Sequence, residues 1–167
     1  SNTSTREVRD AIANLGSQGM KRLIFDLRNN PGGPLDAAVG VSDLFLEEKQ
    51  FITSTRGRTP ENNTTFRAPG NPGGFEGPLV VLVNQGSASA SEIVAGAVQD
   101  HDRGLVLGEV TWGKGLVQTV FTVRDTGLAL TTARYYTPSG RCIQRDYESF
   151  IDYVTYRNGN DSSSSDI

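Results

Sequence analysis

The sequence predicts a single α/β domain, because short apolar strands alternate with helices and glycine-rich turns along its 167 residues. A chain of this length buries roughly two thirds of its unfolded surface in one core. Apolar residues make up 36% of the chain and charged residues 21%, which excludes a fully disordered chain and a coiled coil. We expect residues 1–157 to form the domain and the serine-rich residues 158–167 to form a disordered polar tail.

Hydrophobic periodicity places the elements in order along the chain. Apolar side chains at helical spacing indicate helices, whereas short apolar or alternating runs bounded by turn residues indicate strands. The predicted helices lie at residues 4–15, 35–45 and around 93–98, the strands at 21–27, 51–55, 78–84 and 104–108, and a closing hairpin at 116–123 and 128–136.

Three local features sharpen this prediction. Ser4 and Glu7 have the spacing of a capping box at the start of the first helix. Residues 78–84 are apolar on both faces, which is typical of a parallel strand buried on both sides. Residues 57–77 are polar with few apolar anchors, and we expect them to form an exposed loop or flap, with its role at the functional site left open.

Composition narrows the possible partners. Sixteen basic and nineteen acidic side chains give a formal charge of −3 without a basic cluster, so nucleic acid is not an expected partner. The single cysteine, Cys142, excludes an intrachain disulfide and a multi-thiolate metal site. The single histidine, His101, lies in a polar run that indicates a solvated helix end more than a catalytic or metal-binding role. No metal or organic cofactor is implied.

Glycine-containing loops follow three of the predicted strands, at residues 29–33, 86–91 and 111–115. In an open α/β sheet, loops at the carboxyl ends of strands gather in one crevice, and glycine lets the backbone approach a ligand closely. One such loop alone is more simply a turn. The three together predict a functional site.

Lys114 is the candidate base of this site, since it is flanked by glycines within an apolar stretch. Packing against Trp112 and Leu116 would desolvate the amine, and lowering its pKa from about 10.4 to about 7.5 requires roughly 4 kcal/mol. Gln118, four residues on in a strand, would share a face with Lys114 and accept a hydrogen bond from it. The alternative is a surface lysine beside a turn.

The same stretch resembles a phosphate-binding loop, because Gly108, Gly113 and Lys114 have the spacing of that motif after a strand. Gly115 occupies the position of the metal-binding Ser or Thr. The residues that follow alternate like a strand where the motif requires a helix. Nucleotide binding is therefore disfavoured.

Three serines, Ser87, Ser89 and Ser91, lie where a buried strand meets a helix. A helix N-terminus offers free N–H groups and a positive dipole end, which suit a nucleophile and a developing oxyanion. A structural alternative is that Ser89 and Glu92 form a capping box and the other serines are small fillers. With backbone N–H groups of the turn at residues 32–33 as second donors, the set is sufficient for Ser/Lys acyl transfer.

Three sequence blocks resemble the signature blocks of the carboxyl-terminal processing, or tail-specific, proteases. They are residues 23–33 (LIFDLRNNPGG), 87–93 (SASASEI) and 108–118 (GEVTWGKGLVQ). The resemblance covers about residues 19–144, with the blocks in the family's order and spacing. It implies a crotonase/Clp-protease-like α/β fold of stacked sheet and helices with a C-terminal β-hairpin. It also implies endoproteolysis near the C-terminus of protein substrates with apolar tails.

The resemblance assigns a role to individual residues. It makes Ser89 the nucleophile, Lys114 the general base and Gln118 the residue that orients the base. It makes the backbone N–H groups of Gly33 and Ala90 the oxyanion hole. Arg28 and Asn29 are interpreted as scaffolding for the turn at Gly33.

The sequence departs from the family at two points. Trp112 stands where phenylalanine is expected, a conservative aromatic change. The PDZ domain that family members carry upstream to receive the substrate tail has no counterpart here, so we expect a catalytic core cut from a longer protein. The resemblance implies an extracytoplasmic location, in the bacterial envelope or the thylakoid lumen, and allows a homo-oligomer.

Two other functions compete with proteolysis. Retinoid-binding modules of the same fold hold an apolar ligand without cleaving peptides, and they have no need of the set of Ser89, Lys114 and Gln118. A crotonase-like acyl-thioester enzyme shares the oxyanion chemistry but does not need a buried lysine with its glutamine.

Overall fold

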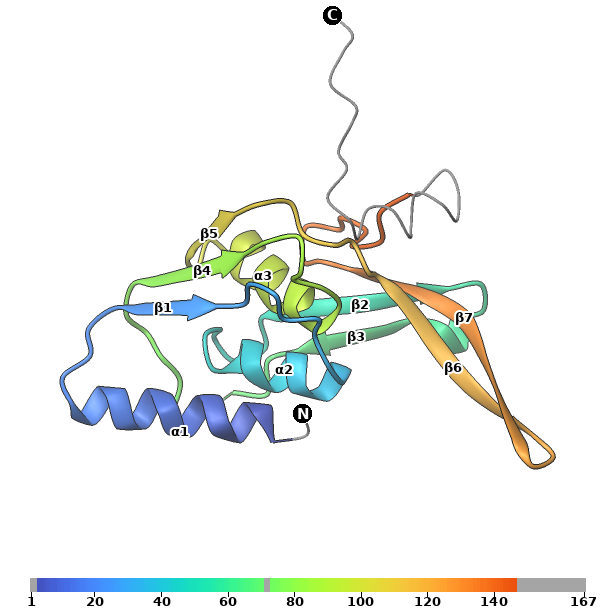
Figure 1. Ribbon diagram of the computed structural model, residues 1–167, viewed down its shortest axis with the longest axis horizontal. Helices are drawn as coiled ribbons and strands as arrows, with labels where there is room; N and C mark the ends of the chain where they lie inside the picture. Colours follow the sequence, from blue (N-terminus) through green and yellow to red (C-terminus); the bar gives the residue numbers. More distant parts are fainter. Residues whose placement is uncertain (1–2, 71–72, 147–167) are drawn as a thin grey trace, which may run out of the picture.

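The computed structural model describes residues 3–70 and 73–146, which form two sheets packed around helices (Figure 1). A parallel sheet has the strand order β1-β4-β5, and an antiparallel sheet has the order β3-β2-β7-β6. The predicted tail at 158–167 lies outside the described residues. The elements are α1 (Ser4–Ser17), β1 (Leu23–Asp26), α2 (Leu35–Asp43), β2 (Phe51–Gly57), η1 (Pro60–Asn62), β3 (Thr64–Arg67), β4 (Leu79–Val83), α3 (Ala90–Asp100), β5 (Leu105–Gly108), β6 (Leu116–Val123) and β7 (Thr126–Tyr136).

The core surrounds α3, which packs against α2 and contacts both β5 of the parallel sheet and β2 of the antiparallel sheet. Apolar side chains from each of these layers meet there and are almost fully buried, because each element turns one apolar face inward. The largest are Leu44, Ile52, Val81, Ile93 and Val98. This core fixes the N-terminus of α3, where Ser89 lies, against both sheets.

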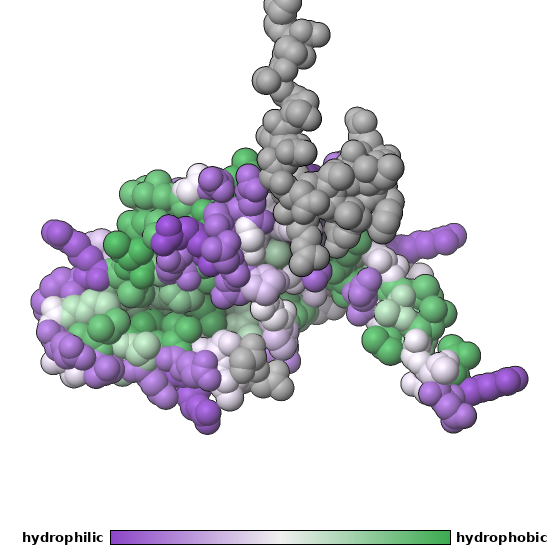
Figure 2. Space-filling model, in the orientation of Figure 1, coloured by the Kyte–Doolittle hydropathy of each residue, from purple (hydrophilic) through white to green (hydrophobic). Residues whose placement is uncertain are grey.

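The parallel sheet is covered on one face only. Along β4, Leu79, Val81 and Val83 are buried, whereas Val80 and Leu82 on the other face are partly exposed. Ile24 and Leu105, which lie beside Val80 in the register, are 67% and 64% exposed. Figure 2 shows this apolar surface over β5. The prediction of a strand buried on both faces is therefore wrong, because helices cover only one side.

The segment predicted as an exposed loop at 57–77 contains regular structure. β2 continues to Gly57, and η1 and β3 follow, with β3 pairing along β2. Phe75 is buried, and the Arg103 guanidinium donates hydrogen bonds to the carbonyls of Phe45, Phe75 and Gly77. Residues 75–77 thus pack near the C-terminal end of α3.

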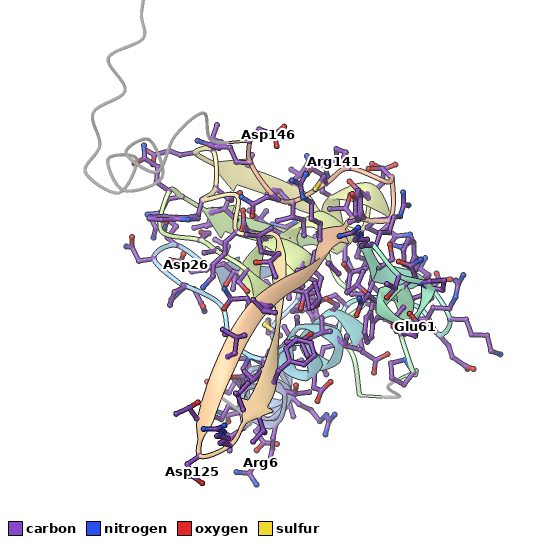
Figure 3. All side chains as sticks on the ribbon, turned by 90° about the vertical axis from the view of Figure 1, so that its right-hand side faces the viewer. Arg6, Asp26, Glu61, Asp125, Arg141 and Asp146 are labelled. Atoms are coloured by element: carbon purple, nitrogen blue, oxygen red, sulfur yellow. The ribbon has the colours of Figure 1, made fainter. Side chains whose placement is uncertain are left out.

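The predicted hairpin of β6 and β7 is confirmed. Arg124 adopts φ 53° in the turn, and the hairpin extends from the antiparallel sheet to a tip at Asp125 (Figure 3). β7 continues back into the sheet, where Ser54 pairs with Tyr136. A bulge interrupts the pairing between Val117 and Gln118. Lys114 precedes β6, so the root of the hairpin carries the loop of the candidate base.

The helix ends agree with the sequence in part. The Thr3 hydroxyl donates to Glu7 at 2.5 Å and Thr3 is the N-cap of α1, so the predicted capping box at Ser4 is wrong. His101 ends α3 as predicted, and its Nε2 lies 2.7 Å from the carbonyl oxygen of Phe51. None of the helices within the described ranges is long and apolar enough to cross a membrane.

Candidate active site

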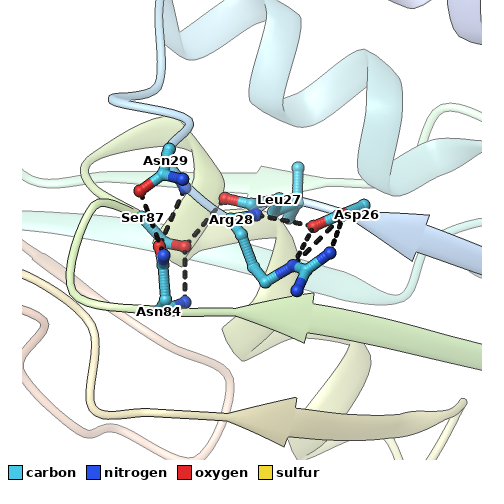
Figure 4. Close-up of polar contacts among 6 residues, drawn as sticks. All are labelled: Asp26, Leu27, Arg28, Asn29, Asn84 and Ser87. Carbon is cyan, nitrogen blue, oxygen red and sulfur yellow. Dashed lines mark hydrogen bonds and ion pairs between the residues drawn. The ribbon is translucent and has the colours of Figure 1, made fainter.

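The three glycine-containing loops meet at the carboxyl ends of the parallel strands, as predicted. Asn84, at the end of β4, holds the first loop: its side-chain oxygen accepts the Asn29 N–H at 2.8 Å, and its amide donates to the Asn29 side chain at 3.0 Å (Figure 4). The Ala88 N–H donates to the carbonyl of Asn30 at 3.0 Å. The turn that precedes Gly33 is thereby bound to the turn that precedes Ser89.

Ser87 connects all three loops and is fully buried. Its hydroxyl donates to the carbonyl of Leu27 at 2.8 Å and accepts the Asn84 N–H at 3.0 Å (Figure 4). Its carbonyl accepts the Trp112 N–H at 3.0 Å. Ser87 is therefore a structural residue whose hydrogen bonds position its neighbours, which explains a serine at this position better than a small filler does.

Ser89 lies at the strained point of the second loop. Its backbone has φ 55° and ψ −115°, a conformation that non-glycine residues rarely adopt, and it is the N-cap of α3. Strain of this kind costs about 1–3 kcal/mol and persists only where surrounding contacts enforce it. A sharp strand-to-helix turn of this type also presents a nucleophilic serine at the start of a helix.

Gly32 brings the first loop into direct contact with this turn. It has φ +87°, and a Cβ there would lie 2.5 Å from the Ala88 carbonyl oxygen and 2.6 Å from the Ala90 nitrogen. Only glycine fits such an approach. Among the described residues, nothing accepts a hydrogen bond from the Gly33 or Ala90 N–H. Two free donors therefore stand beside Ser89.

Glu92 joins the loop of Ser89 to the loop of Lys114. Its carboxylate, only 6% exposed, accepts four hydrogen bonds. Oε2 accepts the N–H groups of Ser89 at 2.8 Å and Lys114 at 2.9 Å, and Oε1 accepts the Gly113 N–H at 2.6 Å and the Thr111 hydroxyl at 2.7 Å. The capping box predicted for Ser89 and Glu92 is present, and its glutamate also fixes the backbone of Lys114.

Lys114 is exposed, which makes the prediction of a lysine buried against Trp112 and Leu116 wrong for the described residues. The strand argument for Gln118 also fails. Lys114 lies before β6 begins at Leu116, and the bulge ahead of Gln118 interrupts the alternation of faces. Within the described ranges no hydrogen bond joins these two side chains, so their partnership is not visible in the resting chain.

A later segment supports the lysine loop from behind. Gly113 has φ +84°, and a Cβ there would lie 2.5 Å from that of Arg145. The Arg145 N–H donates to the Gly113 carbonyl at 3.0 Å, and the side chain of Gln144 accepts the Gly115 N–H at 3.0 Å. The loop at residues 111–115 is thus held between this segment and Glu92.

An ion pair stabilises the exit of β1. The Arg28 guanidinium contacts the Asp26 carboxylate at 2.7 Å (Figure 4). Hydrogen bonds from the Arg28 side chain, and then from its backbone N–H, lower the pKa of Asp26 from 3.8 to about 2. The bonds of Asn29 to Asn84 agree with the interpretation of Asn29 as scaffolding, whereas Arg28 bonds to Asp26 and its part in the turn at Gly33 stays a prediction.

The described side chains form no candidate metal site. Across residues 3–70 and 73–146, no three His, Cys, Asp or Glu side chains gather in an arrangement that could hold one. Cys142 is exposed and has a free thiol.

A strained serine at a helix N-terminus, beside two free N–H groups and a lysine loop, is an arrangement suited to hydrolases that use a nucleophilic serine. Comparison with known proteins agrees with that class. The model of peptidase family S41 matches residues 1–149. The chain belongs to peptidase family S41.

Several relatives within this family are carboxyl-terminal processing proteases. The chain is 48% identical over 138 residues to the carboxy-terminal-processing protease of Bartonella bacilliformis and 46% identical over 142 residues to that of Synechocystis. These matches cover 82% and 84% of this chain but 32% of each relative, so the chain spans about a third of their length.

Solved structures confirm the fold. The photosystem II D1 C-terminal processing protease superposes with a TM-score of 0.78 at 40% identity, covering 86% of this chain and 37% of that protein. An S41 protease from Bacteroides fragilis has a TM-score of 0.66 at 19% identity, covering 81% of this chain and 38% of the other, and supports the fold alone. The α/β fold of these peptidases, with its closing hairpin, is therefore the fold of this chain.

Sequence reasoning missed three parts of the site. The roles of Asn84 and Gln144 could not be predicted from the local sequence. A polar residue at a strand end or in a coil can form many different contacts, and the sequence does not indicate which one. Glu92 was recognisable only as a helix cap, since its contacts with Thr111 and Gly113 cross between segments distant in the sequence. The proximity of the three loops, in contrast, followed from strand order.

Glu92→Gln is expected to lower the free energy of unfolding by about 1–3 kcal/mol. All four partners of this carboxylate donate hydrogen bonds, and an amide replaces one acceptor oxygen with a second donor. Urea unfolding of the variant measures the loss. The same substitution at the exposed Glu109 is the control and should change the free energy by less than about 0.5 kcal/mol. Equal effects at both positions would contradict the bridging role of Glu92.

The ion pair at Asp26 predicts an acid-dependent loss of stability. Because the pKa of Asp26 is lower in the folded chain than its usual 3.8, its contribution is complete above about pH 4 and is lost as the pH falls towards about 2. Urea unfolding between pH 4.5 and 2 should therefore show a smaller decline for Asp26→Asn than for the parent chain. Identical declines would mean that Asp26 does not contribute in this window.

Proposed function

We propose that the chain is the catalytic core of a serine endopeptidase that cleaves protein substrates near an apolar C-terminus. Ser89 is the nucleophile, Lys114 the general base and Gln118 the residue that orients the base, and the N–H groups of Gly33 and Ala90 form the oxyanion hole. The observation that carries this proposal is the bond of one Glu92 oxygen to both the Ser89 and the Lys114 N–H.

The first half of the reaction forms an ester. The unprotonated amine of Lys114 takes the proton from the Ser89 hydroxyl as the oxygen attacks the scissile carbonyl carbon. The carbonyl oxygen becomes an oxyanion that accepts hydrogen bonds from the Gly33 and Ala90 N–H groups. The intermediate then collapses: the C–N bond breaks, the Lys114 ammonium returns its proton to the leaving amine, and the acyl group remains on Ser89.

The second half releases the acyl group. Lys114 takes a proton from a water molecule that attacks the ester carbonyl, and the same oxyanion hole stabilises the second intermediate. Breaking the ester C–O bond returns the proton from Lys114 to the Ser89 oxygen and frees the new carboxyl terminus. No group other than these side chains, the backbone donors and water takes part.

Because Lys114 is exposed, we expect a bound substrate to help activate it as a base. A neutral amine at physiological pH requires desolvation, and the resting chain leaves this side chain open to water. A bound polypeptide, or a further domain packed over the root of the hairpin, would exclude that water. Gln118, at the start of the hairpin, would then accept a hydrogen bond from the amine.

The remaining parts of the proposal concern regions outside this chain and are inferred from its relatives. The chain spans about a third of their length. We expect a PDZ domain in the parent chain to receive the substrate tail. We expect an extracytoplasmic location, consistent with chloroplastic relatives from Tetradesmus obliquus and Arabidopsis thaliana. Assembly into a homo-oligomer is also open to test.

Ser89→Ala and Lys114→Ala should each reduce cleavage at least about a thousandfold, because the two residues act as one unit. Mass spectrometry of a loosely folded protein with an apolar C-terminus measures the cleavage, with this chain alone and joined to a PDZ domain. The controls are Ser139→Ala and Lys49→Ala, which should cleave like the parent. Cleavage that survives either site variant would overturn the assignment. A folded, PDZ-linked chain without cleavage would favour the ligand-binding alternative.

Gln118→Ala should weaken cleavage and change its pH profile, since the amine of Lys114 loses an acceptor that orients it. The pH dependence of kcat/KM for Gln118→Ala and for the neighbouring Thr119→Ala tests this. If both variants keep the profile of the parent chain, Gln118 has no orienting role.

A further inference from the structure

The hairpin of β6 and β7 projects from the antiparallel sheet as a two-stranded ribbon (Figure 1). Phe121 lies opposite Leu128 in its register, and the alternation of strand side chains places Val123 and Leu130 on the same face. Each of these four side chains is between 45% and 50% exposed. We call them the hairpin cluster. Figure 2 shows apolar side chains along the hairpin up to its polar tip.

The projecting part of this ribbon has few strand neighbours. β7 pairs with β2 only over residues 133–136, so nearer the tip β6 and β7 pair only with each other. A two-stranded ribbon is marginally stable in water, and stable sheets need a third strand or a layer packed on an apolar face. The hairpin cluster is such a face. The ribbon is therefore suited to gain a further strand from a partner.

The free edge of the ribbon is β6, which lies at the end of the antiparallel sheet over its whole length. Proteins commonly protect such edges with a lysine, a proline or a bulge. The strand Leu116–Val123 contains no charged residue and no proline, and its bulge lies at the root, between Val117 and Gln118. Within the described ranges, the backbone of β6 bonds to no strand other than β7. Its outer edge is thus open to pairing.

We propose that β6 pairs antiparallel with β6 of a second copy of this chain, about a twofold axis at Val120. This inference goes beyond the proposed function and does not depend on it. Val120 is 68% exposed and lies on the face opposite to the hairpin cluster. Side chains of directly opposite residues project to the same face, so the axis brings the two Val120 side chains together. The same pairing joins the two hairpin clusters into one apolar surface.

Charges at the two ends of β6 favour a second copy over another extended segment. Antiparallel pairing brings the tip of each hairpin, at Asp125, to the root of the other (Figure 3). With the axis at Val120, Asp125 lies opposite Gly115 of the second copy, next to Lys114. Both charged side chains are exposed, and neither has an ion-pair partner within the described ranges. Opposite charges would therefore meet at both ends of the interface.

Sedimentation equilibrium of this chain tests the pairing. The mass should approach that of two chains as the concentration rises. Val120→Lys should weaken dimerisation at least about tenfold, because it places two ammonium groups opposite each other at the axis. Ala129→Lys, opposite Val120 but on β7, is the matched control and should weaken it less than about threefold. A chain that stays monomeric up to millimolar concentration, or equal effects of the two variants, would overturn the proposal.

A charge exchange tests the ends of the interface. Asp125→Lys should weaken dimerisation about fivefold, and adding Lys114→Asp should restore it, because the exchange rebuilds the ion pair with reversed sign. Asp10→Lys, the same charge change at an exposed position of α1, is the control and should leave dimerisation unchanged. If the double variant dimerises no better than Asp125→Lys alone, these two side chains do not meet and the proposed register is wrong.

A disulfide across the axis keeps the proposal testable if a lysine variant fails to fold. In a Cys142→Ser background, Val120→Cys should form a linked dimer under mild oxidation, since opposite Cα atoms of antiparallel strands lie about 4.5–5.5 Å apart. Ala129→Cys in the same background is the control and should stay unlinked on a non-reducing gel. Equal linking of both variants, or of neither, would overturn the proposal.

The other occupant of this edge is an extended segment of a substrate protein. If the chain is monomeric and Val120→Lys weakens its binding to a loosely folded protein, the edge pairs with substrate and the dimer proposal is wrong. None of the association measurements uses cleavage, so the dimer can fail while the protease assignment holds, and the reverse.

Discussion

A single buried carboxylate organises the candidate site. Glu92 accepts the backbone N–H of Ser89 and that of Lys114 on one oxygen, and two further donors on the other. Each of these donors would otherwise need another acceptor or water, at a cost of about 1–3 kcal/mol for a buried group left unpaired. The relative position of the Ser89 and Lys114 backbones therefore depends on the hydrogen bonds of one side chain.

The strained backbone of Ser89 is explained by the contacts around it. Its φ of 55° persists because Glu92 holds its N–H, Ala88 before it is bonded to Asn30, and Gly32 packs against the turn. The same contacts leave the Ala90 N–H free at the start of α3. The strained backbone of Ser89 and the free N–H of Ala90 are thus two consequences of the same packed junction.

Strand order and loop chemistry made much of this architecture predictable. Apolar runs gave β1, β4 and β5, and parallel pairing required their glycine-containing ends to meet. The environment of Lys114 could not be predicted, because burial depends on which residues cover a position in three dimensions. Likewise, the polar composition of residues 57–77 concealed β3, which is stabilised by pairing along β2 and not by a core of its own. Asn84 and Gln144 act through contacts distant in sequence, which periodicity does not encode.

The loop of Lys114 combines a fixed backbone with an exposed side chain. Glu92 accepts the Lys114 N–H at 2.9 Å, whereas the side chain of Lys114 is open to water. The position of this loop is therefore set in the resting chain, and the surroundings of the amine are not. If Lys114 acts as the proposed base, a bound polypeptide or a further domain over the root of the hairpin has to exclude that water.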